Sequence, residues 1–383
     1  MGKKRFGIGA LILTFVLSFA AFGAAAYFLL TRWVSSPVGF VQLGRTLHLI
    51  QSYYVDESNS DDLYAGAIRG MVKELNDPYS EYLDSKDFEA LSNMTEGHFG
   101  GVGLVMGMKD QQFIVVSPIE DTPAYRAGIK AGDIITRVDD TDLAGMTLTD
   151  VVKLLRGADG TTVRVTYKRG DDEKETTITR SEIKIRSVYG KMEDDHIGYI
   201  RITNFNADTA KDFESELKKL EDQGMQALVL DLRDNPGGLL ESGVDVARHL
   251  VPKGPIVSLK DRNGHTEVET SDLEAVKYPL AVLVNHGTAS ASEIVSGAIQ
   301  DTKAGRLFGT KTFGKGVVQN VFMLSPNTAV KLTIAKYYTP SGRSIHKVGI
   351  EPDEVVEAKD EQGKNQLEAA EAYLREQLKA GKE

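Results

Sequence analysis

The sequence predicts a multidomain α+β protein that contains an α/β core, and three observations support this prediction. From residue 197 onwards, apolar strand-like runs alternate with amphipathic helical runs, which is typical of a largely parallel sheet with crossover helices. Before this core, residues 98–182 are rich in strand-like segments separated by glycines, which indicates a separate β-rich domain. At the start of the chain, residues 6–31 contain no charged side chain.

Residues 1–33 form a candidate membrane segment. Basic residues at positions 3–5 precede the uncharged stretch 6–31, and about 20 apolar residues are enough to span a bilayer as a helix. Positive charge at this end predicts a cytoplasmic N-terminus and an extracytoplasmic body. The alternative is a signal peptide that is cleaved near residues 24–26, after which the protein is secreted. Because the stretch is longer than a usual signal segment, we expect an uncleaved single-pass transmembrane helix.

The composition is that of an ordinary globular protein. A chain of 383 residues with 41% hydrophobic and 26% charged residues is long enough for roughly two or three domains with their own cores. Lys and Arg number 45 against 55 Asp and Glu, and the resulting net charge of −10 argues against a nucleic-acid partner, which needs a basic face. The chain has no cysteine, which excludes disulfides, thiol catalysis and cysteine-ligated metals.

Residues 34–97 are expected to form a helical region. Amphipathic helices are predicted over residues 41–53, 62–75 and 86–91. Asp77 and Pro78 end the second of these helices, and Ser85 is suited to cap the third.

Residues 98–182 have the order of elements of a peptide-binding β domain. Strands are predicted over residues 104–108, 113–117, 161–167 and 173–179, and helices over 123–127 and 147–155. The backbone N–H groups of Gly101, Val102, Gly103 and Leu104 can hold the terminal carboxylate of a peptide that adds as a strand beside them. The alternative is that the two glycines only form a tight turn. The order, together with the phrase Ala-Gly-x-x-x-Gly-Asp-x-Ile, resembles a PDZ domain.

The core, residues 183–355, is predicted to place two loops at one edge of its sheet. Strands are predicted over residues 197–203, 227–232 and 279–285, and helices over 207–220, with Asn206 as its cap, and 239–250. The turn Asn-Pro-Gly237-Gly238 and the segment around Ser290 each follow a strand. Because functional sites lie beyond the carboxyl ends of parallel strands, both loops should meet there. A charged helix over 365–378 is predicted in the tail, residues 356–383.

The segment 284–319 carries the two motifs around which the rest is organised. Gly287-Thr-Ala-Ser290-Ala-Ser-Glu293 leads into a helix predicted over 294–300, so Ser290 falls near the helix N-terminus, where free N–H groups favour negative charge. The second motif is Lys311-Thr-Phe-Gly-Lys315-Gly-x-x-Gln319, followed by a strand over 317–323. A serine nucleophile that passes through an oxyanion suits the first setting.

The two motifs, together with Asn-Pro-Gly-Gly, resemble the catalytic region of the carboxyl-terminal processing (tail-specific) serine peptidases. The resemblance implies a serine nucleophile at Ser290, a lysine general base at Lys315 and a supporting glutamine at Gln319. It implies an oxyanion hole made by the N–H groups of Gly237 or Gly238 and of Ala291. The resemblance covers about residues 47–355 and includes Asp-Pro-Tyr-Ser-x-Tyr-Leu at 77–83, in a region that helps members of this family to dimerise. Asp301 matches a helix-borne aspartate of some members, and we assign it a structural role.

Other interpretations of these residues exist. Ser290 and Lys315 taken singly are compatible with a packed turn and a solvated loop. Gly309-x-x-x-x-Gly-Lys315 is most of a phosphate-binding loop, but Gly316 replaces the required Ser or Thr, and a strand rather than a helix is predicted to follow. His286 is the one histidine placed to partner Ser290 in a Ser-His-Asp triad, but no carboxylate is evident to orient it. The protein could instead be a non-catalytic PDZ adaptor, but both motifs are intact, which argues against this alternative.

A lysine base must lose its proton, which its ordinary pKa of about 10.4 opposes at neutral pH. We expect burial to lower that pKa, with Phe313, Val317 and Val318 as apolar walls and Gln319 orienting the amine. The sequence thus predicts a bacterial-type serine endopeptidase that cleaves proteins near apolar C-terminal tails, which its PDZ domain binds. No cofactor and no metal site are predicted.

Overall fold

The computed structural model describes residues 15–19, 21–23, 28, 36–193, 196–360 and 362–380. The chain divides into two units, Met1–Asn76 and Asp77–Glu383. The predicted membrane segment 6–31 lies for the most part outside the described residues. Among the residues that are described, the search for a helix both long and apolar enough to cross a bilayer gives none.

The first unit contains the two predicted helices, α2 (Pro37–Tyr53) and α3 (Ser60–Lys73), which confirms them. Each helix is capped by a side chain that accepts a backbone N–H: Ser36 from Gly39, and Asn59 from Asp61. Val72 is the one buried residue in the described parts of this pair. Most apolar side chains of α2 are exposed, whereas in α3 the exposed ones are Tyr64 and Met71.

The core of the second unit is a six-stranded sheet. Its strands, in sheet order, are β10 (Val188–Met192), β11 (Ile197–Ile202), β12 (Ala227–Asp231), β15 (Leu280–Val284), β16 (Arg306–Gly309) and β19 (Glu354–Val355). The β10–β11 pair is antiparallel and every other pair is parallel, so the predicted largely parallel sheet is confirmed.

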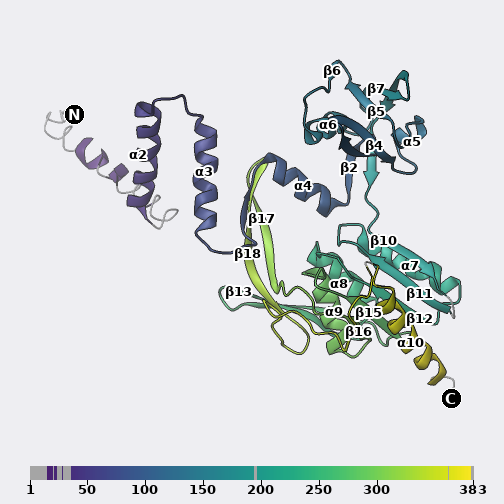
Figure 1. Cartoon of the computed structure of the whole chain (residues 1–383). Helices are drawn as coiled ribbons and strands as arrows, with labels where there is room; N and C mark the ends of the chain where they lie inside the picture. The colour runs from purple at the N-terminus through teal and green to yellow at the C-terminus, as the bar shows by residue number, and fades with distance from the viewer. Residues whose placement is uncertain are drawn as a thin grey trace, which may run out of the picture. The chain divides into compact units, whose positions relative to one another are not determined.

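Helices cover both faces of this sheet, as Figure 1 shows. One face packs on α7 (Thr209–Asp222), α8 (Leu240–Arg248) and α9 (Ala291–Asp301), and the other packs on α10 (Lys364–Ala380). Alternate residues of β12 point to opposite faces of the sheet. Leu228 and Leu230 pack on the side of α7, α8 and α9, and Ala227 and Val229 pack on the side of α10. Because both faces are buried, the central strands are continuously apolar. Helix α7 begins two residues later than predicted, with Asp208 at its N-cap, while Asn206 accepts the Asp208 N–H.

A second, antiparallel sheet lies beside the core. Its strands are β1 (Glu81–Leu83), β13 (Gly254–Asp261), β14 (Thr266–Ser271), β17 (Val317–Ser325) and β18 (Thr328–Tyr338). β17 confirms the strand predicted over residues 317–323, whereas β1, β13 and β14 were not foreseen. β1 pairs with β18. A segment that precedes the β-rich domain in the sequence is therefore part of the sheet that lies beside the α/β core.

The β-rich domain has a sheet in the order β3 (Leu104–Lys109), β4 (Gln112–Pro118), β5 (Ile134–Val138), β7 (Thr162–Arg169) and β8 (Asp172–Thr179). A short strand, β6 (Thr141–Asp142), and the helices α5 (Pro123–Arg126) and α6 (Leu148–Leu155) complete it, with a hydrophobic core of its own. The ribbon of β2 (His98–Gly101) and β9 (Ser181–Lys184) links this domain to the rest of the chain.

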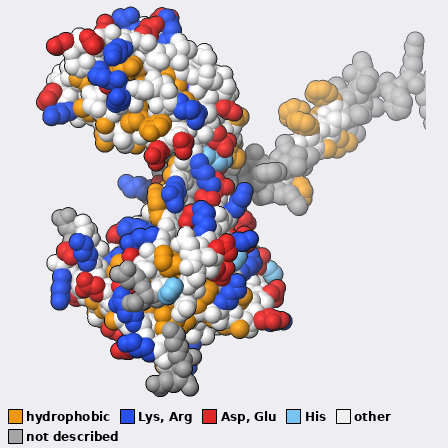
Figure 2. All heavy atoms as spheres, turned by 90° about the vertical axis from the view of Figure 1, so that its right-hand side faces the viewer, with side chains coloured by type: hydrophobic (Ala, Val, Ile, Leu, Met, Phe, Trp, Pro, Cys, Tyr) orange, Lys and Arg blue, Asp and Glu red, His pale blue; other side chains and the backbone are white. Residues whose placement is uncertain are grey.

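The helix before this ribbon, α4 (Ser85–Glu96), is longer than predicted, and Asp84 rather than Ser85 caps it. The Asp84 carboxylate accepts the N–H groups of Lys86 and Asp87, both at 3.0 Å. A carboxylate at this position satisfies two orphan donors at once and interacts favourably with the helix dipole. Over the face that Figure 2 shows, basic and acidic side chains are interspersed.

Candidate active site

Ser290 occupies a strained turn between β15 and α9. Ser290 lies near a helix N-terminus, as predicted, but α9 begins three residues earlier than expected, so Ser290 is its N-cap. Its φ of 56° and ψ of −118° form a backbone conformation that non-glycine residues rarely adopt. Its N–H donates to Glu293 Oε2 at 3.0 Å, and its carbonyl accepts from the Tyr337 hydroxyl at 3.1 Å. Strain of this kind persists only where the surroundings hold it, and it is typical of functional sites.

The Asn235-Pro-Gly-Gly238 turn is fastened to the Ser290 turn. The Asn235 carbonyl accepts the Ala289 N–H at 3.0 Å and the Ser292 hydroxyl at 3.1 Å. A Cβ on Gly237 would lie 2.7 Å from the Ser290 Cβ, at a φ of +96°, so only glycine fits. The two loops that were predicted to meet at one edge of the sheet do meet there.

The candidate oxyanion donors are not equivalent. The Gly237 N–H donates to Asn235 Oδ1 at 2.9 Å and is therefore engaged within its own turn. Ala291 is the first residue of α9, where a backbone N–H has no partner inside the helix. Gly238 is exposed at the turn and lines the same cleft as Ser290. In the described structure, the Gly238 and Ala291 N–H groups are the pair that has no hydrogen-bond acceptor.

Glu293 connects the two motifs. Its carboxylate is fully buried and accepts four hydrogen bonds. Oε1 accepts the Thr312 hydroxyl at 2.6 Å and the Gly314 N–H at 2.8 Å. Oε2 accepts the Lys315 N–H at 2.8 Å and the Ser290 N–H. Burial raises the pKa of the Glu293 carboxyl, and these hydrogen bonds oppose the rise. One side chain thus holds the backbones of Ser290 and Lys315 together, a role that the sequence pattern had not suggested.

Lys315 is half-buried, and its pKa is lowered. The cause is burial in the first place and the charge of Lys331 in the second, while Glu293, Glu81 and Asp77 act in the opposite direction. β17 begins two residues later, so a strand follows the glycine-rich loop, and the helix that a phosphate-binding loop requires does not.

A cleft of about 520 Å³ brings together the predicted residues of the core: Gly237, Gly238, Ser290, Ala291, Lys315 and Gln319. No hydrogen bond within the described structure joins the Ser290 hydroxyl to Lys315 Nζ. Gln319 Nε2 donates to Thr333 Oγ1 at 3.5 Å, a long contact, instead of to a group on Lys315. The residues are gathered but the hydrogen bonds between them are not made, which is common in sites without substrate.

The walls of the cleft differ in part from the prediction. Val317 and Val318 line it, but Phe313 does not; its ring is 46% exposed and lies 5.6 Å from the ring of His286. Helix α4 supplies much of the apolar lining, through Phe88, Leu91 and Met94 among others. Those α4 residues were missed because nothing in their own spacing indicates which distant loop they cover.

The remaining candidates in the core have structural surroundings. His286 packs on Phe313 and is absent from the residues that line the cleft. Asp301 accepts the N–H and hydroxyl of Ser341 and pairs with Arg343; burial opposes ionisation, but these groups together lower the pKa of Asp301. The contacts of Asp301 agree with the structural role assigned to it from the sequence.

In the β-rich domain, the segment Gly101 to Leu104 runs from the end of β2 into β3. The Val102 carbonyl accepts the Ala124 N–H at 2.8 Å and the Gly103 carbonyl accepts the Ile119 N–H at 3.0 Å, so carbonyls hold the loop to the segment that leads into α5. β3 is at the end of the sheet order, which leaves one of its edges without a strand partner among the described residues. Such an edge suits the addition of a peptide strand.

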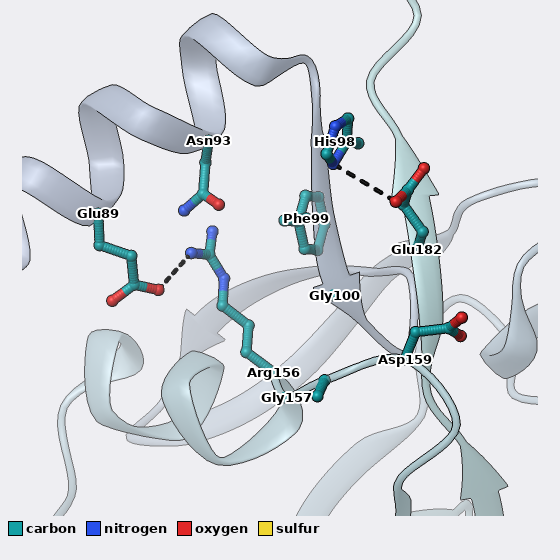
Figure 3. A pocket seen from close by; sticks show the side chains of 10 residues that line it. Glu89, Asn93, His98, Phe99, Gly100, Arg156, Gly157, Asp159 and Glu182 are labelled. Atoms are coloured by element: carbon teal, nitrogen blue, oxygen red, sulfur yellow. Dashed lines mark hydrogen bonds and ion pairs between the residues drawn. The ribbon is translucent and has the colours of Figure 1, made fainter.

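A second cavity of about 330 Å³ lies where α4, the β2–β9 ribbon and the end of α6 meet. Arg156, just past the end of α6, lies in this cavity: it pairs with Glu89 of α4 at 2.9 Å, and its guanidinium lies over the Phe99 ring, 4.9 Å from the ring centroid. Figure 3 shows Glu89 and Asn93 pointing from α4 towards it. Within the described residues, no cluster of three or more His, Asp or Glu side chains could hold a metal ion.

Comparisons with known proteins agree with this arrangement. Residues 196–356 match peptidase family S41, residues 114–169 match the PDZ domain, and residues 31–87 match the N-terminal domain of the activating protease CtpB. The chain is 37% identical over 367 residues to a probable CtpA-like serine protease of Staphylococcus aureus (strain MRSA252), which covers 94% of this chain and 73% of that protein. The chain belongs to peptidase family S41.

Two further relatives are similar to this S41 chain. A probable CtpA-like serine protease of Staphylococcus haemolyticus (strain JCSC1435) is 42% identical over 304 residues, a match that covers 78% of this chain and 61% of that protein's length. Among solved structures, the photosystem II D1 C-terminal processing protease is 34% identical, with 82% of this chain and 89% of that chain covered and a TM-score of 0.49. The matches to peptidase family S41 and to the PDZ domain, together with the curated relatives, show that the chain is a serine peptidase with a PDZ domain.

Proposed function

We propose that this protein is a serine endopeptidase in which Ser290 is the nucleophile, Lys315 is the general base and the N–H groups of Gly238 and Ala291 form the oxyanion hole. The observation that carries the proposal is the position of Glu293, whose one carboxylate oxygen accepts the N–H groups of both Ser290 and Lys315. The lowered pKa of Lys315 supports its role as a base, since burial favours the neutral amine.

The proposed mechanism needs a short rearrangement of side chains. When a peptide occupies the cleft, water leaves it, and Lys315 Nζ approaches the Ser290 hydroxyl, with the Gln319 amide turned from Thr333 to orient the amine. Lys315 takes the hydroxyl proton, Ser290 attacks the peptide carbonyl, and the two N–H groups hold the oxyanion. The protonated lysine gives its proton to the leaving amine, and water then hydrolyses the acyl-enzyme with Lys315 again as base.

We propose further that substrates are proteins with apolar C-terminal tails. The free edge of β3 and the segment Gly101 to Leu104 would bind the tail as an added strand with its carboxylate at the loop. The cleft near Ser290 has apolar side chains from α4, α8, α9 and β17, which favours apolar residues close to the scissile bond.

The experiment is hydrolysis of an unfolded reporter protein with three C-termini: an apolar tail, the same tail with a terminal amide, and a tail of aspartates. Wild-type protein should cleave the first fastest, while Ser290→Ala and Lys315→Arg should be inactive, because arginine cannot act as a base. Equal cleavage by wild type and Lys315→Arg would overturn the assignment of the base. Equal cleavage of all three reporters would overturn the proposed substrate class.

The cellular setting is part of the proposal. The uncharged stretch 6–31 and the basic residues at 3–5 support a single-pass membrane anchor with the peptidase outside the cytoplasm. The exposed apolar side chains of α2, with Tyr64 and Met71 of α3, support a homodimer through this region. Alkaline extraction of membranes tests the first proposal, since an uncleaved anchor stays in the pellet and a secreted protein does not. Sedimentation of residues 36–383 tests the second.

A further inference from the structure

The turn 77–80 lies against the proposed general base. Lys315 Nζ lies over the ring of Tyr79, 5.2 Å from the ring centroid. Tyr79 does not line the 520 Å³ cleft, whereas Lys315 does. The amine therefore has the substrate cleft on one side and an aromatic ring on another. The sequence had marked this turn as the end of a helix and as part of the family resemblance, but not as a neighbour of Lys315.

The turn is fixed to the strand that pairs with the end of the lysine loop. Asp77 accepts the Tyr79 N–H at 3.2 Å and the Ser80 hydroxyl at 2.6 Å, and the Ser80 hydroxyl accepts the Thr333 N–H of β18 at 3.0 Å. β1 then pairs with β18 through Glu81, Tyr82 and Leu83. Because β18 also pairs with β17, which begins two residues after Lys315, the ring and the amine are carried by one sheet.

The ring of Tyr79 is also supported from a second direction. The His346 ring lies edge-on to it, with centroids 6.3 Å apart, and both side chains are half-buried. The backbone at Gly316 passes close to His346, since a Cβ at Gly316 would lie 2.6 Å from the His346 N atom. The ring of Tyr79 thus lies between His346 and Lys315.

We propose that Tyr79 is a positioning residue for catalysis: its ring closes the side of Lys315 away from the substrate cleft, keeps water from the amine there and fixes its direction. The proposal rests on the proposed function, since it needs Lys315 as the base. Tyr79 does not touch substrate and acts only through Lys315.

Two effects of the ring on the amine have opposite signs. Exclusion of water favours the neutral amine, whereas the negative π face favours the cation. The charged groups that face Lys315 are Lys331 on β18, Glu293 on α9, Glu81 on β1 and Asp77 in the turn, and His346 faces the ring from the other side. Burial lowers the pKa of Lys315 more than any charged neighbour does, and the proposal requires that exclusion of water outweigh the π contact.

The test is the pH dependence of kcat/KM for wild type and for Tyr79→Phe, Tyr79→Leu and Tyr79→Ala in the full chain. Tyr79→Phe keeps the ring and should keep the acid limb of the profile. The leucine side chain of Tyr79→Leu excludes water but has no π face to favour the cation. The acid limb of this variant should therefore lie at the same pH as that of the wild type or at a lower pH. Tyr79→Ala admits water, so its limb should move up by about one pH unit. At neutral pH this shift lowers kcat about tenfold, with KM unchanged and recovery at high pH.

Tyr189→Ala is the matched control, because Tyr189 also carries a cation over its ring, Arg186 at 4.8 Å, outside the residues that line the cleft. It should leave the limb in place. An unmoved limb in folded Tyr79→Ala, or an equal upward shift in Tyr79→Leu, would overturn the proposal while Lys315→Arg remains inactive. Wild-type activity in Lys315→Arg would instead overturn the proposed function and this inference with it.

Discussion

Replacing Glu293 by glutamine tests whether one buried carboxylate holds the nucleophile and the base in place. Glutamine has nearly the same shape, but its NH₂ group cannot accept a hydrogen bond. In one orientation of the amide, the NH₂ faces the N–H groups of Ser290 and Lys315; in the other, it faces Thr312 and the Gly314 N–H. Either orientation leaves at least one buried backbone N–H without an acceptor.

The expected magnitude follows from those contacts. Each buried N–H without an acceptor costs about 1–3 kcal/mol of the free energy of unfolding, so the variant is destabilised by about 1–6 kcal/mol. A protein whose free energy of unfolding is about 5–15 kcal/mol stays folded if the loss is near the lower end of this range of about 1–6 kcal/mol. Catalysis should suffer more, because a displacement of about 1 Å in a reacting group can lower the rate about 100-fold. We expect kcat/KM to fall by about that factor or more.

The assay combines hydrolysis of the apolar-tailed reporter with urea unfolding followed by circular dichroism. Glu214→Gln, at an exposed position of α7, is the control for the loss of one negative charge. It should have wild-type activity and stability. Near wild-type activity in folded Glu293→Gln would refute the reasoning, and so would an equal loss in Glu214→Gln.

Further predictions concern the glycine turn, the pH dependence and the PDZ domain. Gly237→Ala should lose nearly all reporter hydrolysis, because the added Cβ would lie 2.7 Å from the Ser290 Cβ. Gly264→Ala is the control: its φ is similarly positive, but nothing lies within 4 Å of the added Cβ, so it should keep its activity. Because burial and then Lys331 lower the pKa of Lys315 from 10.5, a pH–rate profile of the wild type should rise through a pKa below that value and fall away in acid. Asp133 is buried and bound by two guanidinium N–H groups of Arg169; burial alone would raise the pKa of Asp133, but these bonds and the Lys130 N–H lower it from 3.8. The contribution of Asp133 to stability is therefore present above pH 3.8 and is lost as the pH falls through the lower folded-state pKa. Thermal unfolding of Asp133→Asn should show a loss of about 1–3 kcal/mol at neutral pH and a weaker dependence on acid than wild type shows.

Local sequence signals were enough to predict the elements that bear the two motifs. The small residues around Ser290, the Asn-Pro-Gly-Gly turn and the alternation of strands and helices each have a local physical cause, and β15, α9 and β17 lie where those signals put them. Because both loops follow strands of one parallel sheet, their meeting at one cleft was also predictable.

The parts that were not predicted depend on partners that are far away in the sequence. Glu81 is 250 residues before Lys331, and nothing local to Asp77-Pro-Tyr-Ser shows that β1 will pair with β18 and carry Tyr79 to Lys315. The same holds for the apolar residues of α4 that line the cleft. Phe313 was wrongly expected in the cleft because an apolar side chain beside a lysine in sequence need not point to the same side in a loop.

The central claim is that Lys315 takes the proton from Ser290, and covalent labelling tests it without a protein substrate. An alkyl fluorophosphonate reacts with a serine hydroxyl only when a base activates it, and intact-mass spectrometry follows the rate. The account predicts modification of wild type at Ser290, no modification of Ser290→Ala, and labelling of Lys315→Arg at least about 100-fold slower than wild type, in keeping with the usual contribution of a general base. Labelling of Ser290 in folded Lys315→Arg at the wild-type rate would contradict it.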